Sequence, residues 1–297
     1  MRKLLAAATI ALLPVALPDA RAEDEPSGKA ARESLHIDTE HIFGFNEGGD
    51  IGEAGDKELE KETAMRFGKR AGSYAAVSSL FNLKYVPVEG VLISPGILFA
   101  YHNISNVPGL DDRSGLSFQG LQFELKYNLV DREHAPFGMT VFAAPRWTRI
   151  DEASGERAGL YSTEFTLAFD KELIANRLFG VINLVYEPEV SRPRDTGIWE
   201  RTSQFGFGTG VTAQIRPGMF LGAEARYLRS HDGLAMGALK GDAFFFGPTF
   251  YSKLTDHSFL SLAWNAQLAG RAVGEAGALD LTNFERHQVR LRIGMEF

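Results

Sequence analysis

The fold is decided by the last stretch of the chain, residues 286–297, which reads RHQVRLRIGMEF. Apolar side chains occupy every second position at its centre, where Val289, Leu291 and Ile293 stand. The positions between them carry arginine, glutamine or glycine. A period of two places successive side chains on opposite faces of a β-strand. The stretch therefore predicts a strand with one apolar face and one ionic face.

The same alternation recurs along the chain in segments of 10 to 18 residues. Strands of soluble sandwiches usually run about five or six residues, whereas strands that cross a bilayer at a tilt need about 9 to 11. The segments fit the second class. The twelve expected strands are 36–45, 73–86, 91–102, 115–129, 137–149, 159–171, 177–188, 198–215, 219–230, 242–254, 258–270 and 286–297.

The connections between these segments alternate in length. The short ones are 87–90, 131–136, 172–176, 216–218 and 255–257, and the longer ones are 46–72, 103–114, 150–158, 189–197, 231–241 and 271–285. Outer-membrane barrels have short periplasmic turns and longer extracellular loops. We therefore expect an all-β, antiparallel, up-and-down transmembrane barrel of about 12 strands with both termini periplasmic. Residues 61–67 leave an added hairpin open, which would give 14 strands.

The N-terminus indicates export. Arg2 and Lys3 precede the apolar stretch 4–17, and Ala20-Arg21-Ala22 follows it, as in a cleaved secretory signal peptide over 1–22. Residues 23–34 lack apolar periodicity and predict a disordered periplasmic lead-in, so the barrel is expected over 35–297. The chain has no cysteine and a pI near 5.6, which argues against disulfide scaffolds, thiolate metal sites and nucleic-acid binding.

Together, the signal peptide and the terminal strand resemble those of Gram-negative outer-membrane β-barrel proteins. The ending 289–297 is similar to the segment that the barrel-assembly machinery recognises in that class, so the resemblance implies that Phe297 serves as an assembly signal. It also implies an outer-membrane location, with membrane lipid and lipopolysaccharide as partners. The resemblance is to the class, and no specific functional family is matched.

Alternation assigns charged side chains of both signs to the barrel lumen. They are Lys84, Glu124, Lys126, Arg146, Glu164, Glu224, Arg226, Arg290 and Arg292, with Asp170, Glu187, Arg286 and Glu296 in the same class. On one strand, Gly206, Gly208 and Gly210 leave space for a cavity or for a side chain from across the barrel. Two functions follow. The lumen is a passive pore for a small solute, or it is a paired network inside a closed structural or surface-interacting barrel.

Enzymatic and metal-dependent functions are not supported. His102 and Ser105 resemble the His-x-Ser-Asn motif of outer-membrane phospholipase A and lipid A deacylase, but at three residues apart they fall on opposite strand faces. The seven histidines form no H-x-H or HExxH pattern. We therefore expect no catalytic residues, no cofactor and no metal site.

Overall fold

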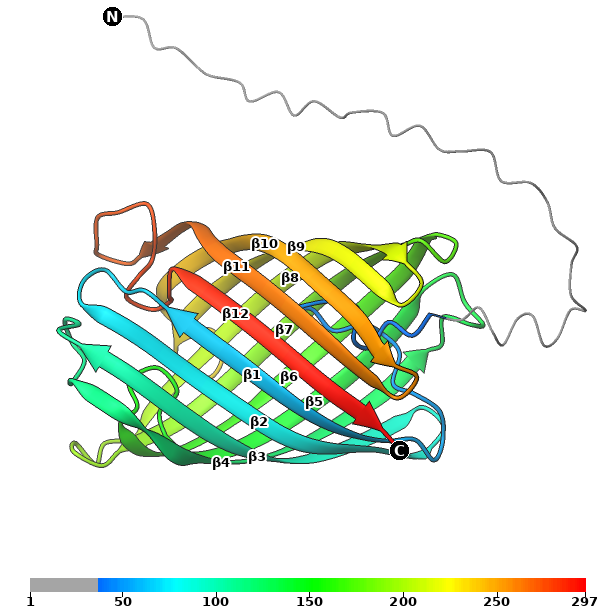
Figure 1. The fold of residues 1–297 in the computed structure, drawn as a ribbon. Helices are drawn as coiled ribbons and strands as arrows, with labels where there is room; N and C mark the ends of the chain where they lie inside the picture. Colours follow the sequence, from blue (N-terminus) through cyan, green and yellow to red (C-terminus); the bar gives the residue numbers. More distant parts are fainter. Residues whose placement is uncertain (1–36) are drawn as a thin grey trace, which may run out of the picture. The chain divides into compact units, whose positions relative to one another are not determined.

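The computed structural model describes residues 37–297, and its strands form one closed antiparallel barrel (Figure 1). Neighbouring strands follow chain order, and the first pairs with the last. The strands are β1 (Lys57–Phe67), β2 (Ser73–Val88), β3 (Val91–Ser105), β4 (Arg113–Val130), β5 (Gly138–Ile150), β6 (Arg157–Ile174), β7 (Leu178–Pro193), β8 (Glu200–Arg216), β9 (Met219–Asp232), β10 (Leu239–Thr255), β11 (Ser258–Ala272) and β12 (His287–Glu296). The predicted class and the count of twelve are confirmed. The signal peptide and lead-in predicted over 1–34 lie outside the described residues.

The barrel wall is apolar outside and polar inside. On β4, Leu121, Phe123 and Leu125 are each 44–48% exposed on the outer face. On the inner face, Glu224 and Arg292 are only 1% and 2% exposed. This inversion is typical of strands whose outer face meets hydrocarbon. Among residues 37–297, no helix is long and apolar enough to cross a membrane.

The seam that closes the barrel is built from its two shortest strands. β1 has 11 residues and β12 has 10, whereas the other ten have 13 to 18. Their register is continuous, from Glu58 opposite Glu296 to Phe67 opposite His287. The terminal backbone N–H of Phe297 also donates to the carbonyl of Lys57. The seam is therefore short, and its ladder has no interruption.

The two ends of the barrel differ in connection length as predicted, except at 131–137, which has seven residues. One end, here called the turn end, carries connections 89–90, 131–137, 175–177, 217–218 and 256–257. The other, here called the loop end, carries 68–72, 106–112, 151–156, 194–199, 233–238 and 273–286. The C-terminus lies at the turn end (Figure 1). Which end faces the periplasm stays a prediction.

The prediction for the first strand was wrong. Residues 36–45 were expected in the wall, and 46–72 as one long loop, but the first wall strand is β1 at residues 57–67. Nearly all positions from Thr39 to Asn46 are buried, so this stretch has no outward face. Its charged and its apolar side chains are both buried, which suits a segment enclosed by protein. The count of twelve held because one expected strand was lost and the stretch that includes 61–67 became another.

The faces of β12 yield a test of membrane orientation. Leu291 lies mid-strand opposite Leu262, which is 40% exposed on the outer surface. Leu291→Arg should destabilise the folded barrel in lipid by about 2–4 kcal/mol, since it places a charge in hydrocarbon near the midplane. Arg292→Leu removes a lumen cation that contacts Phe43 and Glu47, so it should lower stability through those contacts while leaving insertion into lipid intact. Urea titration of both variants in lipid vesicles measures this, and equal losses of insertion would contradict the assigned faces.

A candidate gate inside the barrel

Residues 37–56, here called the inner segment, lead directly into β1 (Figure 1); most of residues 39–51 are buried inside the barrel, and residues 52–56 are exposed. Among the described residues, no backbone–backbone hydrogen bond joins 37–52 to a strand, and the first such bonds link Gly55 and Asp56 to Val86. Side chains of the wall bind the backbone of the segment instead. Buried backbone groups need such partners. The segment is thus held by side chains and is not part of the sheet.

One side of the inner segment is apolar. Ile42 and Phe43 are 2% and 1% exposed, and they pack against Phe179 of β7 and Phe220 of β9. The two wall rings meet edge to face, with centroids 6.0 Å apart. Apolar residues beside the charged side chains of the lumen need an apolar partner to be stable there. This patch therefore fixes which way the segment faces.

Glu224 of β9 anchors the turn at the tip of the segment. Its carboxylate accepts hydrogen bonds from the backbone N–H groups of Gly44 at 2.8 Å, Phe45 at 2.7 Å and Asn46 at 3.4 Å. A Cβ at Gly44 would lie 2.4 Å from Cβ of Ala263, so glycine permits this close approach. Hydrogen bonds to an ionised acceptor are about twice as strong as neutral ones.

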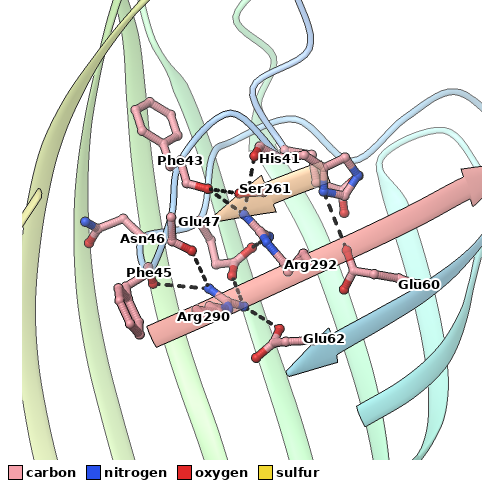
Figure 2. Close-up of polar contacts among 12 residues, drawn as sticks. His41, Phe43, Phe45, Asn46, Glu47, Glu60, Glu62, Ser261, Arg290 and Arg292 are labelled. Atoms are coloured by element: carbon pink, nitrogen blue, oxygen red, sulfur yellow. Dashed lines mark hydrogen bonds and ion pairs between the residues drawn. The ribbon is translucent and has the colours of Figure 1, made fainter. Parts of the chain in front are cut away.

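Two arginines of β12 bind the opposite side of the segment (Figure 2). Arg290 forms ion pairs with Glu47 of the segment at 2.7 Å and with Glu62 of β1 at 2.6 Å. Arg292 donates to the carbonyl of Phe43 at 2.6 Å and lies 3.4 Å from Glu47. Glu47 therefore connects the segment to both arginines, and Arg290 extends the network across the seam.

Two lysines complete this polar side. Lys84 of β2 lies 3.0–3.1 Å from the carboxylates of Glu40, Glu58 and Glu60. Lys126 of β4 lies 3.4 Å from Glu40 and 3.7 Å from Glu47. Each basic side chain thus reaches an acidic residue of the segment. The lumen charges form a network centred on residues 40 and 47.

His41 lies within the same cluster. Its Nε2 is 3.0 Å from Glu58, its Nδ1 is 3.7 Å from Glu60, and its ring stacks on Phe259 at 4.0 Å. The donor atoms of His41, Glu58 and Glu60 lie within 4.8 Å of one another, as metal ligands would. The ammonium of Lys84 already supplies a cation to both carboxylates, so the residues present favour an ion-pair cluster over a metal centre.

The charged groups of the segment are stabilised in their ionised forms. Burial opposes ionisation of Glu47, but Arg290 and Arg292 hold the pKa of Glu47 well below its ordinary value. For His41, burial and Lys84 disfavour the proton, yet the carboxylates of Glu58 and Glu40 prevail and raise its pKa above 6.5. The segment therefore binds most tightly with Glu47 ionised and His41 protonated.

These pKa shifts predict a pH range in which the inner segment is held most tightly inside the barrel. The stabilisation that ionised Glu47 gives to the bound inner segment is fully present above its ordinary pKa of 4.5. It is lost as the pH falls through the lower pKa that Glu47 has in the folded protein. The contribution of His41 is present below 6.5 and is lost as the pH rises through its raised folded value. Protease resistance of the inner segment should therefore be greatest between pH 4.5 and pH 6.5. His41→Gln should remove only the alkaline decline, and an unchanged profile would contradict the assignment.

The structure places the predicted lumen charges in several settings. Lys84, Lys126, Arg290, Arg292 and Glu224 contact the inner segment, and Glu124 lies 3.7 Å from Lys126. Arg146 hydrogen-bonds Gln122, and Arg226 stacks 3.7 Å from the Phe45 ring centroid. Glu164 accepts a hydrogen bond from Thr166. The acidic partners of the two β12 arginines are Glu47 and Glu62.

The sequence patterns did not identify Glu40, His41 and Glu47 as site residues, because residues 36–45 were assigned to a wall strand and residues 46–72 to a loop. One available signal was the glycine set on β8. A Cβ at Gly208 would lie 1.9 Å from Oδ1 of Asn46, so this glycine makes room for the segment. Of the two alternatives for that space, a side chain fills it at Gly208.

A polar cavity of about 380 Å³ separates the inner segment from the loop end. Phe45 and Asn46 line it from the segment, and Phe284 and Glu285 line it from loop 273–286. Arg226 connects the two sides, because it stacks on Phe45 and donates to Gln288, which in turn donates to Glu285 at 3.3 Å. A further cavity of about 210 Å³ lies at residues that include Asp151 and Ser203.

His102 and Ser105, the two residues of the hydrolase-like motif, each have another hydrogen-bond partner. The His102 ring is 2% exposed, and its Nε2 lies 3.0 Å from the carbonyl oxygen of Glu152. Ser105 ends β3, and its hydroxyl accepts from the amide of Asn106. No direct contact between His102 and Ser105 is present in the described part of the chain.

Comparison with known proteins finds solved structures with a similar fold and one matching family. No curated protein matches the chain. The COG4313 outer membrane channel from Pseudomonas putida F1 superposes with a TM-score of 0.57 at 14% identity, covering 84% of this chain and 98% of that one. The NanC porin gives 0.46 at 12%, covering 80% and 98%, and the KdgM porin in complex with disordered oligogalacturonate gives 0.41 at 10%, covering 81% and 98%. The first match shows a shared outer-membrane barrel fold. The family of unknown function DUF6662 matches residues 35–297, and the chain therefore belongs to that family.

Proposed function

We propose that this protein is an outer-membrane channel for passive passage of small solutes and that the inner segment is its gate. The observation that carries the proposal is the attachment of the segment. Residues 37–52 fill the lumen without any backbone–backbone hydrogen bond to the described strands. The segment is able to leave, therefore, without breaking the sheet that closes the barrel.

The chemistry of the lumen supports passage of a polar solute. The wall is polar inside, and a cavity of about 380 Å³ lies directly above the tip of the segment. Removal of the segment would join that cavity to the turn end. Selectivity in such pores comes from charged side chains lining the path. The outward apolar face supports an environment of outer-membrane lipid, and the short turns support a periplasmic turn end.

A closed structural barrel is the second candidate, and the ion-pair network favours it. Lys84, Lys126, Arg290 and Arg292 all contact acidic residues of the segment. A network that never opens would serve only to fill the lumen. The two functions differ in one measurable property, which is whether the segment leaves often enough to pass current.

Single-channel recording of Glu224→Leu tests the proposal. Hydrogen bonds to a charged acceptor contribute about 1.5–3 kcal/mol each, so losing those from Gly44 and Phe45 should raise the open probability by roughly tenfold or more. Glu200→Leu, a change at an exposed position of β8, is the matched control and should behave as the wild type. Folded barrels that stay silent in both wild type and Glu224→Leu would favour the structural function.

A further inference from the structure

Three carboxylates on β6 and β7 stand out from the rest of the lumen network. We call Glu164, Glu187 and Glu189 the acidic ladder. The register pairs Ser162 with Glu189 and Phe165 with Tyr186, which sets Glu164 opposite Glu187. Like charges directly opposite each other on paired strands are destabilising. The fold therefore keeps this arrangement at a cost in stability.

No basic side chain of the described residues forms an ion pair with the ladder, and Arg146 is a cation that acts on it from a longer distance. Among residues 37–297, no ion pair joins any of its three members to a basic side chain, and Glu164 has only a 3.3 Å hydrogen bond from Thr166. The other acidic residues lining the larger cavity do have basic partners, namely Glu47, Glu60, Glu62, Glu124, Glu152 and Glu285. The acidic residues of that cavity that form no ion pair are therefore confined to β6 and β7, and its basic residues without an ion pair are Arg146 and Arg226.

The wall at β6 and β7 faces open space. Glu164 and Glu187 line the cavity of about 380 Å³, while Glu187 and Glu189 line the cavity of about 210 Å³. Asp151 also lines the smaller cavity. Arg146 is the one basic residue among its described lining residues, and it forms no ion pair. Three unpaired acids therefore face one base there. A solute that enters from the loop end meets an excess of negative charge before it reaches the gate.

Two buried amides that line the larger cavity each have one atom without a hydrogen-bond partner. Asn46 and Asn82 are 1% and 6% exposed, and both line the cavity. Nδ2 of Asn46 and Oδ1 of Asn82 make no hydrogen bond. Buried polar atoms without partners are rare in proteins, and each such atom calls for a ligand or water. One offers a donor and the other an acceptor.

We infer that these cavities form a solute subsite for a small organic cation that also carries hydrogen-bonding groups. The acidic ladder attracts the cationic group, and the amides of Asn46 and Asn82 bind its polar atoms. This inference rests on the proposed channel function and adds the class of solute. It places charge selection on β6 and β7, whereas Arg290 and Arg292 bind the inner segment.

Ion selectivity is the direct test. Reversal potentials in a tenfold KCl gradient should show cation selectivity for the wild type and for the Glu224→Leu background. Glu164→Gln, Glu187→Gln and Glu189→Gln combined should lower the ratio of K⁺ to Cl⁻ permeability by roughly tenfold. The matched control removes three exposed carboxylates by Glu89→Gln, Glu133→Gln and Glu200→Gln, and it should leave the ratio near that of the wild type.

Liposome swelling gives a second readout with a matched pair of solutes. Protonated glucosamine should enter faster than glucose, and the triple ladder variant should abolish this difference. Currents that are anion-selective, or that are unchanged by the ladder variant, would overturn the inference while leaving the channel intact. Silence of every variant, including Glu224→Leu, would instead overturn the channel function itself.

Discussion

Oxidation of a variant with cysteines at positions 46 and 208 should silence the channel, and reduction should restore its current. Cγ of Asn46 lies 3.0 Å from the position of a Cβ at Gly208. A disulfide places the sulfur of one cysteine about 3 Å from the Cβ of the other, so Asn46→Cys and Gly208→Cys are positioned to bond. The natural chain has no cysteine to compete. Recording in the Glu224→Leu background ensures that current is present before oxidation.

The two single-cysteine variants are the controls, because neither is able to form the bond. Their current should not respond to oxidant or reductant. A double variant that forms the disulfide quantitatively, yet conducts as well oxidised as reduced, would show that passage does not require the segment to move.

Glu47→Leu should have the largest effect on stability. Its carboxylate contacts Arg290 at 2.7 Å, Arg292 at 3.4 Å and Lys126 at 3.7 Å. Removing one partner of a buried ion pair typically costs about 3–5 kcal/mol, because the remaining charge is left uncompensated. The inner segment should lose its hold on β12, so thermal unfolding should begin earlier and open probability should rise.

Glu53→Leu is the matched control, since it removes the same charge from the same segment at an exposed position. It should change neither unfolding nor current. Tryptophan fluorescence during heating and bilayer recording measure the two effects. Equal behaviour of the Glu47 and Glu53 variants would contradict the central place of Glu47 in the network.

The wall of the barrel was predictable because it obeys a local rule. In residues 286–297, each side chain faces lipid or lumen according to its parity, and Ile293 and Arg292 occupy the expected faces. Lengths of alternating segments and of connections then sufficed for class, strand count and the difference between the two ends. None of these needed knowledge of which residues meet across the lumen.

The inner segment was not predictable in the same way. Residues 36–45 alternate well enough to resemble a strand, and what distinguishes residues 39–45 is their burial inside the barrel, a tertiary property. The pairing of Arg290 with Glu47 joins positions 243 residues apart, and no pattern in the sequence relates them. Gly208 was a true signal of space, but it did not specify that Asn46 would fill it.

The position of Arg290 at the seam has a consequence for biogenesis. Glu62 on β1 and Arg290 on β12 belong to strands from opposite ends of the chain, and they come together only when the last strand pairs with the first. The full set of contacts to Glu47 is therefore absent from any unfinished barrel. Occupancy of the lumen by the inner segment thus reports that closure is complete, and it adds cohesion to the shortest pair of strands at that moment.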